Sequence, residues 1–245
     1  MIVASITMSA QANNKYTIMQ KTQYENNAKE WSIHNLSPVV GSFNQHNIWK
    51  DYEFLFKDIE NVEQKKCLDF GCGPGRNLVK YARKFKRIDG VDIAQKNLDN
   101  AALWIKHNNL DPQDHTLFLC NGVDLNGIGD AEYDIVMSTI CMQHICVYDI
   151  RLNYLQEFYR VLKDGGHITI QMGYGTPSPK TVDYYDNYYD ALTTNRGCDT
   201  SISNYTQVEI DLVSIGFKNF TYYIRPTGPG DFHPYWIFFN AQKIL

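Results

Sequence analysis

The stretch that most restricts the fold is Cys67–Arg76, which reads Cys-Leu-Asp-Phe-Gly-Cys-Gly-Pro-Gly-Arg. A short apolar run suited to a buried strand leads into three glycines at alternate positions, and residues 77–83 then carry a helical pattern. Glycine is needed in such a turn because the chain passes through backbone angles that are closed to residues with a Cβ atom. The bare backbone also lets a ligand lie against the positive end of the following helix. The stretch therefore predicts a strand–turn–helix unit with a nucleotide-type ligand site.

Two common glycine-rich motifs do not match this turn. A dinucleotide fingerprint, G-x-G-x-x-G, needs glycine where the helix packs on the strand, but Arg76 stands there. A phosphate-binding P-loop needs Gly-Lys and then Ser or Thr at the helix start, which this stretch lacks. What remains is Asp69-x-Gly71-x-Gly73-x-Gly75, which closely resembles the first motif of the class I S-adenosylmethionine-dependent methyltransferases.

The rest of the chain alternates between strand and helix patterns. Strands are predicted at 87–93, 115–120, 133–139 and 167–172, and helices at 95–107 and 147–162. Such alternation indicates parallel strands joined by right-handed crossovers. A helix at 207–215 and two strands at 217–224 and 235–241 close the chain. The resemblance implies a Rossmann-like α/β class I methyltransferase fold: a seven-stranded, mostly parallel sheet, helices on both faces, and a closing antiparallel strand pair.

We expect an N-terminal arm with lid helices over residues 1–60 and a methyltransferase domain over 61–245. Residues 1 to about 20 are polar and irregular, and we expect a disordered leader there. Helices are predicted at 23–31 and at 48–56, the second capped by Ser42 or Asn44. The arm carries Trp31, His34, Phe43, His46 and Trp49, which are interpreted either as ordinary packing or as a lid over cofactor and substrate.

An insert at about 174–205 lacks strand periodicity and is rich in polar residues and tyrosine. We expect it to form a substrate cap. The tyrosines at 184, 185, 188 and 189 favour contacts with a ring or a sugar, or else they hold the insert together.

The resemblance also implies how S-adenosylmethionine binds. Its methionine part would lie over the turn at Gly71–Gly73, where backbone groups reach it, and Asp92 would accept both ribose hydroxyls at the end of the second strand. Asp92 is alternatively a helix cap. Asn121 stands where the family has an acidic residue facing the adenine amino group, and Ile93 and Val123 would enclose the purine or belong to the core. The cofactor-binding residues implied are Asp69, Gly71, Cys72, Gly73, Asp92, Ile93, Asn121, Gly122, Val123 and Ser138.

Three residues are candidates for the chemistry. His144 follows the fourth strand, in the loop that faces the transferred methyl group in this architecture, and is the first candidate for a base or substrate ligand. His233 begins the last strand, and Tyr174 follows the fifth. Packing, capping or fixing a turn is the alternative role of the histidines. The histidines are scattered, without metal-ligand spacing, so no metal is expected.

Composition and charge limit the kinds of partner and compartment that we expect for this protein. A formal net charge of −4 gives no electrostatic footprint for nucleic acid, and no apolar run approaches membrane-spanning length. Six cysteines without C-x-x-C pairs indicate reduced thiols in a cytoplasmic protein. Nothing in the sequence indicates an oligomeric state.

The sequence thus predicts methyl transfer from S-adenosylmethionine to an oxygen or nitrogen of a small polar molecule, a class that includes sugar-like acceptors. A non-catalytic S-adenosylmethionine-binding or partner subunit of the same fold is the alternative, because fold does not determine function. An NAD-dependent oxidoreductase is disfavoured by Arg76 and by the lack of a second strongly marked domain.

Overall fold

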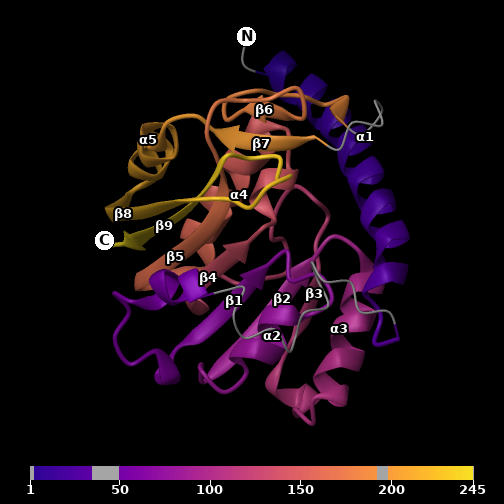
Figure 1. Ribbon diagram of the computed structural model, residues 1–245, viewed down its shortest axis with the longest axis vertical. Helices are drawn as coiled ribbons and strands as arrows, with labels where there is room; N and C mark the ends of the chain where they lie inside the picture. The colour runs from indigo at the N-terminus through magenta and orange to yellow at the C-terminus, as the bar shows by residue number, and fades with distance from the viewer. Residues whose placement is uncertain (1–2, 35–49, 192–197, 245) are drawn as a thin grey trace.

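The computed structural model describes residues 3–34, 50–191 and 198–244, and within them it contains a nine-stranded sheet. Seven of the strands make up the expected core, in the order β3-β2-β1-β4-β5-β9-β8 (Figure 1). They are β1 (Lys66–Phe70), β2 (Arg87–Asp92), β3 (Leu117–Leu119), β4 (Tyr133–Thr139), β5 (Leu162–Tyr174), β8 (Phe217–Pro226) and β9 (Tyr235–Lys243).

The pairing follows the class I methyltransferase pattern. β1 lies parallel to β2, with Cys67 opposite Ile88, and parallel to β4 on its other edge. β9 runs antiparallel to β5, and β8 pairs with the outer edge of β9. The predicted fold class is confirmed.

Helices cover both faces of this sheet. α2 (Arg76–Tyr81) and α3 (Gln95–His107) pack on one face, together with the 3₁₀ segment Lys50–Phe56. α4 (Tyr148–Val161) and α5 (Tyr205–Ile215) pack on the other. α3 presents Leu98, Ala101 and Ile105 to the sheet, at the spacing of one helix face. No helix in the described part of the chain is both long and apolar enough to cross a membrane.

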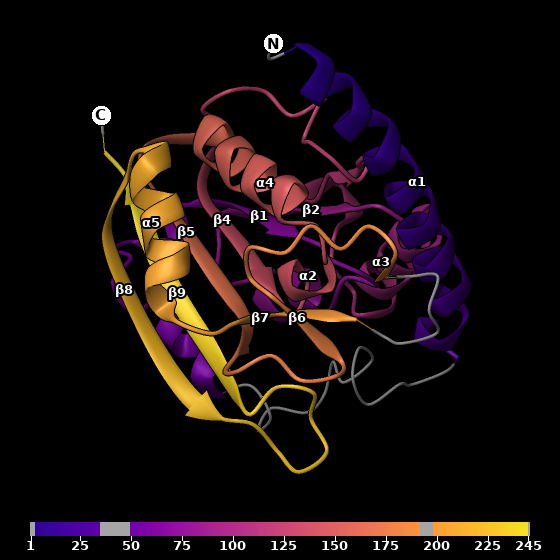
Figure 2. The same ribbon diagram turned by 90° about the horizontal axis from the view of Figure 1, so that it is seen from above.

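The prediction of a disordered N-terminal leader is wrong for the described residues from Val3 onward. Val3–Asn27 form a 25-residue helix, α1, which lies along the edge of the molecule beside α3 (Figures 1 and 2). A 3₁₀ turn, Ala28–Trp31, continues it, where the sequence predicted a helix over 23–31. Its polar sequence lacks an obvious apolar stripe, and tertiary contacts stabilise the helix instead. The expected caps Ser42 and Asn44, and also Phe43, His46 and Trp49, lie outside the described residues.

The insert is the second correction. It contributes two strands, β6 (Thr181–Asp183) and β7 (Asp199–Ile202), which pair in parallel. β4 stops at Thr139, opposite Gln171, whereas β5 continues to Tyr174. β9 occupies one edge of β5 over this last stretch, so β7 pairs with Gly173 and Tyr174 on the edge that β4 has left. This pairing carries the insert over the carboxyl ends of the parallel strands.

Candidate active site

The glycine turn after β1 adopts the backbone that the sequence requires. Gly71 and Gly75 have φ values of 69° and 86°, in the left-handed region that favours glycine. A Cβ atom on Gly71 would lie 2.0 Å from Cys141 Sγ, so the loop after β4 packs directly on the turn. The amides of Gly71 and Cys72 donate to the Val91 carbonyl, at 2.9 and 3.1 Å. These amides are thus already bonded within the protein.

Asp92 ends β2 beneath this turn and is 7% exposed. Its Oδ2 accepts the Gly73 amide at 2.9 Å, and its Oδ1 accepts the Ala94 amide at 2.9 Å and Asn97 Nδ2 at 3.1 Å. Burial raises the pKa of Asp92, against the opposing effect of these hydrogen bonds. Asp92 therefore bonds to the start of α3, and it also faces the cavity described below.

Asp69 and Asn77 form a buried polar pair at the foot of α2. Asn77 Nδ2 donates to Asp69 Oδ1 at 3.3 Å and to Thr139 Oγ1 at 2.9 Å. Among the described residues, Asp69 Oδ2 and Asn77 Oδ1 have no hydrogen-bond partner. Burial raises the pKa of Asp69 to about 7, with Asn77 acting in the opposite direction. Asn77 lines the cavity described below, whereas Asp69 lies behind the lining. An unpartnered buried acceptor is costly, and an ammonium group bound in the cavity would satisfy Asn77 Oδ1.

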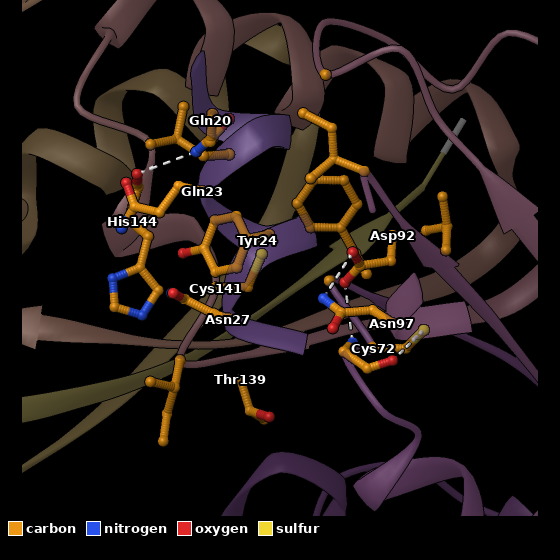
Figure 3. Close-up of a pocket in the computed structure, with 18 of the residues that line it drawn as sticks. Gln20, Gln23, Tyr24, Asn27, Cys72, Asp92, Asn97, Thr139, Cys141 and His144 are labelled. Carbon is orange, nitrogen blue, oxygen red and sulfur yellow. Dashed lines mark hydrogen bonds between the residues drawn. The ribbon is translucent and has the colours of Figure 1, made fainter. Parts of the chain in front are cut away.

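A cavity of about 360 Å³ lies at the carboxyl ends of β1, β2 and β4, and the glycine turn, Asn77 and Asp92 line it (Figure 3). α1 closes one side of it with Gln20, Gln23, Tyr24 and Asn27, which extend into the space. Cys198 and Asp199 line it from the insert, and His144 lines it from the loop after β4. The site therefore draws on the arm, the sheet and the insert together.

Part of the cavity lining is apolar. Ile93 lines it beside Cys120, Gly122 and Tyr154, and a Cβ on Gly122 would lie 2.6 Å from Ile93 Cδ1. This slot suits a flat ring such as adenine.

Other implied cofactor residues lie away from the cavity lining. Asn121 is exposed, and its Oδ1 accepts the amides of Val123 and Asp124 at 2.8 and 3.0 Å within its own loop. Val123 is held by Asn153, which donates to its carbonyl at 2.8 Å. Ser138 is fully buried and donates to the Phe70 carbonyl at 3.1 Å, linking β4 to β1.

His144 reaches the cavity from the short turn after β4. Its Nδ1 lies 2.7 Å from Asp199 Oδ1, and its side chain is 33% exposed. Burial alone would lower the pKa of His144, but the charge and hydrogen bond of Asp199, with the Ile140 carbonyl, raise it above the ordinary 6.5. Ile140 itself has a φ of 54°, a strained conformation for a β-branched residue. Such strain is typical of loops that position functional groups.

The other two candidates for the chemistry lie behind the cavity lining. His233 is 1% exposed and approaches Asp199 from the far side, with Nε2 3.2 Å from Oδ2. Tyr174 is half-buried at the end of β5 and packs against Tyr235. The insert tyrosines also turn away: Tyr184 donates to Asp211 at 2.9 Å and Tyr185 to the Gln207 carbonyl at 3.2 Å, both on α5. These two tyrosines hold the insert to the domain.

The contribution of α1 to the cavity was not predicted from the sequence. Tyr16, Gln20 and Tyr24 share one helix face at a spacing of four residues. Gln20 Nε2 donates to the His144 carbonyl at 3.1 Å, and Tyr16 accepts the Cys146 amide at 2.8 Å. This four-residue spacing of large polar side chains was the available signal.

α1 is also attached to α3. Glu25 accepts the amides of Gln95 and Lys96, at 2.6 and 3.4 Å, at the start of α3. Asn100 Nδ2 donates to the Ala28 carbonyl at 2.8 Å, and the Trp104 indole donates to the Trp31 carbonyl at 3.1 Å. These bonds hold the end of α1 and the turn after it against α3.

Sequence comparison agrees with this geometry. A family described as "Methyltransferase domain" matches residues 68–170. A ubiquinone biosynthesis O-methyltransferase of Pelagibacter ubique is 23% identical over 62% of this chain, and the chain spans 60% of that relative's length.

Structural comparison shows the same fold. A phosphoethanolamine N-methyltransferase of Haemonchus contortus, bound to phosphomonomethylethanolamine and S-adenosylhomocysteine, superimposes with a TM-score of 0.62. It is 20% identical, with 89% of this chain and 56% of that chain covered. The cyclase SpnF gives a TM-score of 0.60 at 16% identity, with 79% and 80% covered. Together, the matched segment, the strand order and the glycine turn identify a domain of the class I S-adenosylmethionine-dependent methyltransferase family in this chain.

Proposed function

We propose that this protein transfers a methyl group from S-adenosylmethionine to a hydroxyl or amine of a small molecule, with His144 as the base. The observation that carries the proposal is that one cavity is lined by the glycine turn and Asp92 as well as by His144, which lies across it from Asp92 (Figure 3). Proximity and orientation are the main contributions that a protein makes to such a displacement.

The residues around the cavity fit the cofactor. Asp92 keeps one acceptor position, on Oδ2, for a ribose hydroxyl, since a carboxylate has about four acceptor positions and three are occupied. The apolar slot beside Ile93 and Gly122 accepts the adenine ring. The methionine ammonium would bond to Asn77 Oδ1, and to carbonyl oxygens of Gly71–Gly73, because amides of that turn are already engaged. When bound, S-adenosylmethionine supplies a methyl group on a positively charged sulfur, which leaves as a neutral thioether as the acceptor atom bonds the methyl carbon.

His144 would take the proton that the acceptor loses. With Nδ1 held by Asp199, Nε2 is the nitrogen that remains for a substrate. A positioned base of this kind contributes roughly 10²–10⁴-fold to a rate. Because the pKa of His144 is raised, we expect turnover to increase with pH as the ring loses its proton.

The arm and the insert would form the substrate cap. Gln23 and Asn27 on α1 extend their amide groups into the cavity, and the aromatic residues Trp31 and Phe232 also line it. This mixture suits a small polar or aromatic molecule, and the net charge of −4 disfavours nucleic acid. The relative from Pelagibacter ubique is named as an O-methyltransferase and the Haemonchus contortus protein as an N-methyltransferase, so the proposal includes both oxygen and nitrogen as the acceptor atom.

The test combines binding with turnover. Calorimetry would titrate the protein with S-adenosylhomocysteine and, separately, with NADH. Isotope-labelled S-adenosylmethionine would then be offered with protocatechuate as a hydroxyl probe and with ethanolamine and phosphoethanolamine as amine probes.

Binding of S-adenosylhomocysteine together with labelling of a probe supports the proposal. A His144→Gln variant should still bind S-adenosylhomocysteine but lose roughly 10²-fold or more in turnover. Binding of NADH alone contradicts the proposal, and binding of S-adenosylhomocysteine without labelling of any probe would favour a non-catalytic subunit.

A further inference from the structure

The carboxylate of Asp199 lies between two imidazole rings. Its Oδ1 is 2.7 Å from Nδ1 of His144, and its Oδ2 is 3.2 Å from Nε2 of His233. Gln143 Nε2 donates to the same Oδ2 at 3.3 Å. Both oxygens are therefore occupied by side chains, and the carboxylate is fixed in orientation.

Three separate parts of the chain build this array. His144 follows β4, Asp199 begins β7 of the insert, and His233 precedes β9. Gly173 on β5 makes room for the inner ring, since a Cβ there would lie 2.2 Å from Nδ1 of His233. Ser201, two residues after Asp199, lies 3.4 Å from the same Nδ1. β5 and β7 thus pack around the His233 ring, which precedes β9, is 1% exposed and lies outside the cavity lining.

We propose that Asp199 and His233 are positioning residues for His144: Asp199 holds the Nδ1–H tautomer, so that Nε2 faces the cavity as the base, and His233 fixes Asp199. The proposal rests on the proposed function for the role of His144. It makes the insert part of the catalytic apparatus as well as a cover.

The proton path follows from the donor and acceptor roles. Nδ1–H donates to Asp199, Nε2 accepts the proton of the acceptor group, and the resulting imidazolium faces a carboxylate that stays ionised. Burial would raise the pKa of Asp199, but His144 and His233 hold it well below its ordinary value. The proton then leaves from Nε2 to solvent, and Asp199 itself is never protonated.

Other ionisable groups line the same cavity, and their charges also affect the protonation of His144. Tyr24 on α1 packs its ring 6.4 Å from that of His144, and the Ile140 carbonyl also favours the protonated ring. The remaining titratable groups of the lining are Cys72, Arg76, Asp92, Cys120, Cys141, Tyr154 and Cys198. Removal of Asp199 alone leaves these groups in place, so its effect on His144 can be isolated.

The first test needs no acceptor molecule. Long-range proton–nitrogen spectra of protein labelled at the histidine rings report the tautomer and pKa of each ring. The chain has seven histidines, and the His144 and His233 signals are assigned by their loss in His144→Gln and His233→Gln. We expect neutral His144 to carry its proton on Nδ1, and its pKa to fall in Asp199→Asn. An Nε2–H tautomer in the unaltered protein, or an unchanged pKa in Asp199→Asn, would overturn the proposal.

Asp183→Asn is the matched control. Asp183 lies on β6, opposite Ser201 of β7, and its carboxylate accepts from Gln207 and Ser203, both beyond β7. This variant removes an insert carboxylate without touching His144, so the tautomer and pKa of His144 should stay unchanged. If Asp199→Asn does not fold by circular dichroism, the tautomer in the unaltered protein and the effect of His233→Gln on the His144 pKa decide the question.

Turnover supplies the second test, with whichever probe the unaltered protein methylates. We expect Asp199→Asn to lose at least about tenfold in kcat and to move the pH midpoint of kcat downward, whereas Asp183→Asn changes neither. A fall in kcat with an unmoved midpoint would show a merely structural role for Asp199. If no probe is methylated, the proposed function fails, and the ring spectra still decide whether Asp199 positions His144.

Discussion

Gly73 and Asp92 are joined by a hydrogen bond of 2.9 Å from the Gly73 amide to Asp92 Oδ2. The bare turn after β1 and the acid at the end of β2 are therefore one unit, and each fixes the position of the other.

The first prediction concerns this acid. Asp92→Asn should weaken S-adenosylhomocysteine binding by about 1–3 kcal/mol, because an amide offers fewer acceptor positions to the ribose. Calorimetry measures the change. Asp99→Asn, on the exposed side of α3, is the control and should bind normally. An unchanged dissociation constant in Asp92→Asn would mean that Asp92 serves only as a helix cap.

The second prediction concerns Gly71. Gly71→Ala should lower stability by about 2 kcal/mol or more, because the alanine has a positive φ and its Cβ meets Cys141. The loop that bears His144 would also move. Thermal unfolding checks the effect against Gly228→Ala, where a Cβ meets nothing within 4 Å. Equal melting temperatures for the two variants would contradict the close packing of turn and loop.

The third prediction concerns the arm. Glu25→Gln removes a charge from the start of α3 and should loosen α1 by about 0.3–1 kcal/mol. Hydrogen exchange of the amides in residues 16–28 should become faster. Glu30→Gln, exposed on the same arm, provides the comparison and should leave that exchange unchanged. Equal exchange in both variants would show that Glu25 does not hold the arm.

The fourth prediction concerns the cysteines. A hydrogen bond from the Cys146 thiol lowers the pKa of Cys198, against the opposing effect of burial. Burial raises the pKa of Cys72 and of Cys120 in the same cavity. Iodoacetamide should therefore modify Cys198 first, because the thiolate is the reactive form. Peptide mass spectrometry would locate the label, and earlier labelling of Cys72 or Cys120 would refute the assignment.

Occupancy of the cavity should also protect this thiol. S-adenosylhomocysteine should slow labelling of Cys198, which lines the cavity, and Cys198→Ser should remove the fast phase. Fast labelling that persists in Cys198→Ser would point to another thiol.

The fifth prediction concerns pH and stability. The pKa of His144 is raised in the folded protein, so its pairing with Asp199 stabilises the fold fully below the unfolded pKa of about 6.5. This contribution is lost as the pH rises through the folded pKa. The urea midpoint of the unaltered protein should therefore fall more steeply above pH 6.5 than that of His144→Gln. Parallel pH profiles would contradict the pairing.

The sequence alone determined the central architecture. The apolar run before Gly71 makes a buried strand, and the spacing of Leu98, Ala101 and Ile105 makes an amphipathic helix, because these patterns are local. The family resemblance, which rested on the motif Asp69-x-Gly71-x-Gly73-x-Gly75, and the fold class that it implied are confirmed. The cofactor and catalytic residues remain predictions, of which Gly71–Gly73, Asp92, Ile93, Gly122 and His144 line the cavity.

Tertiary structure decided what closes that cavity. α1 has a polar sequence that predicts a frayed leader, and it folds because Tyr16, Gln20 and Glu25 find partners far away in the chain. Asp199 belongs to no recognisable sequence motif. It contacts His144 only because β5 extends beyond the end of β4, so that β7 pairs with the edge of β5 that β4 does not cover. Local patterns encode single strands and helices, whereas a contact between residues 55 positions apart depends on how strands of unequal length pair.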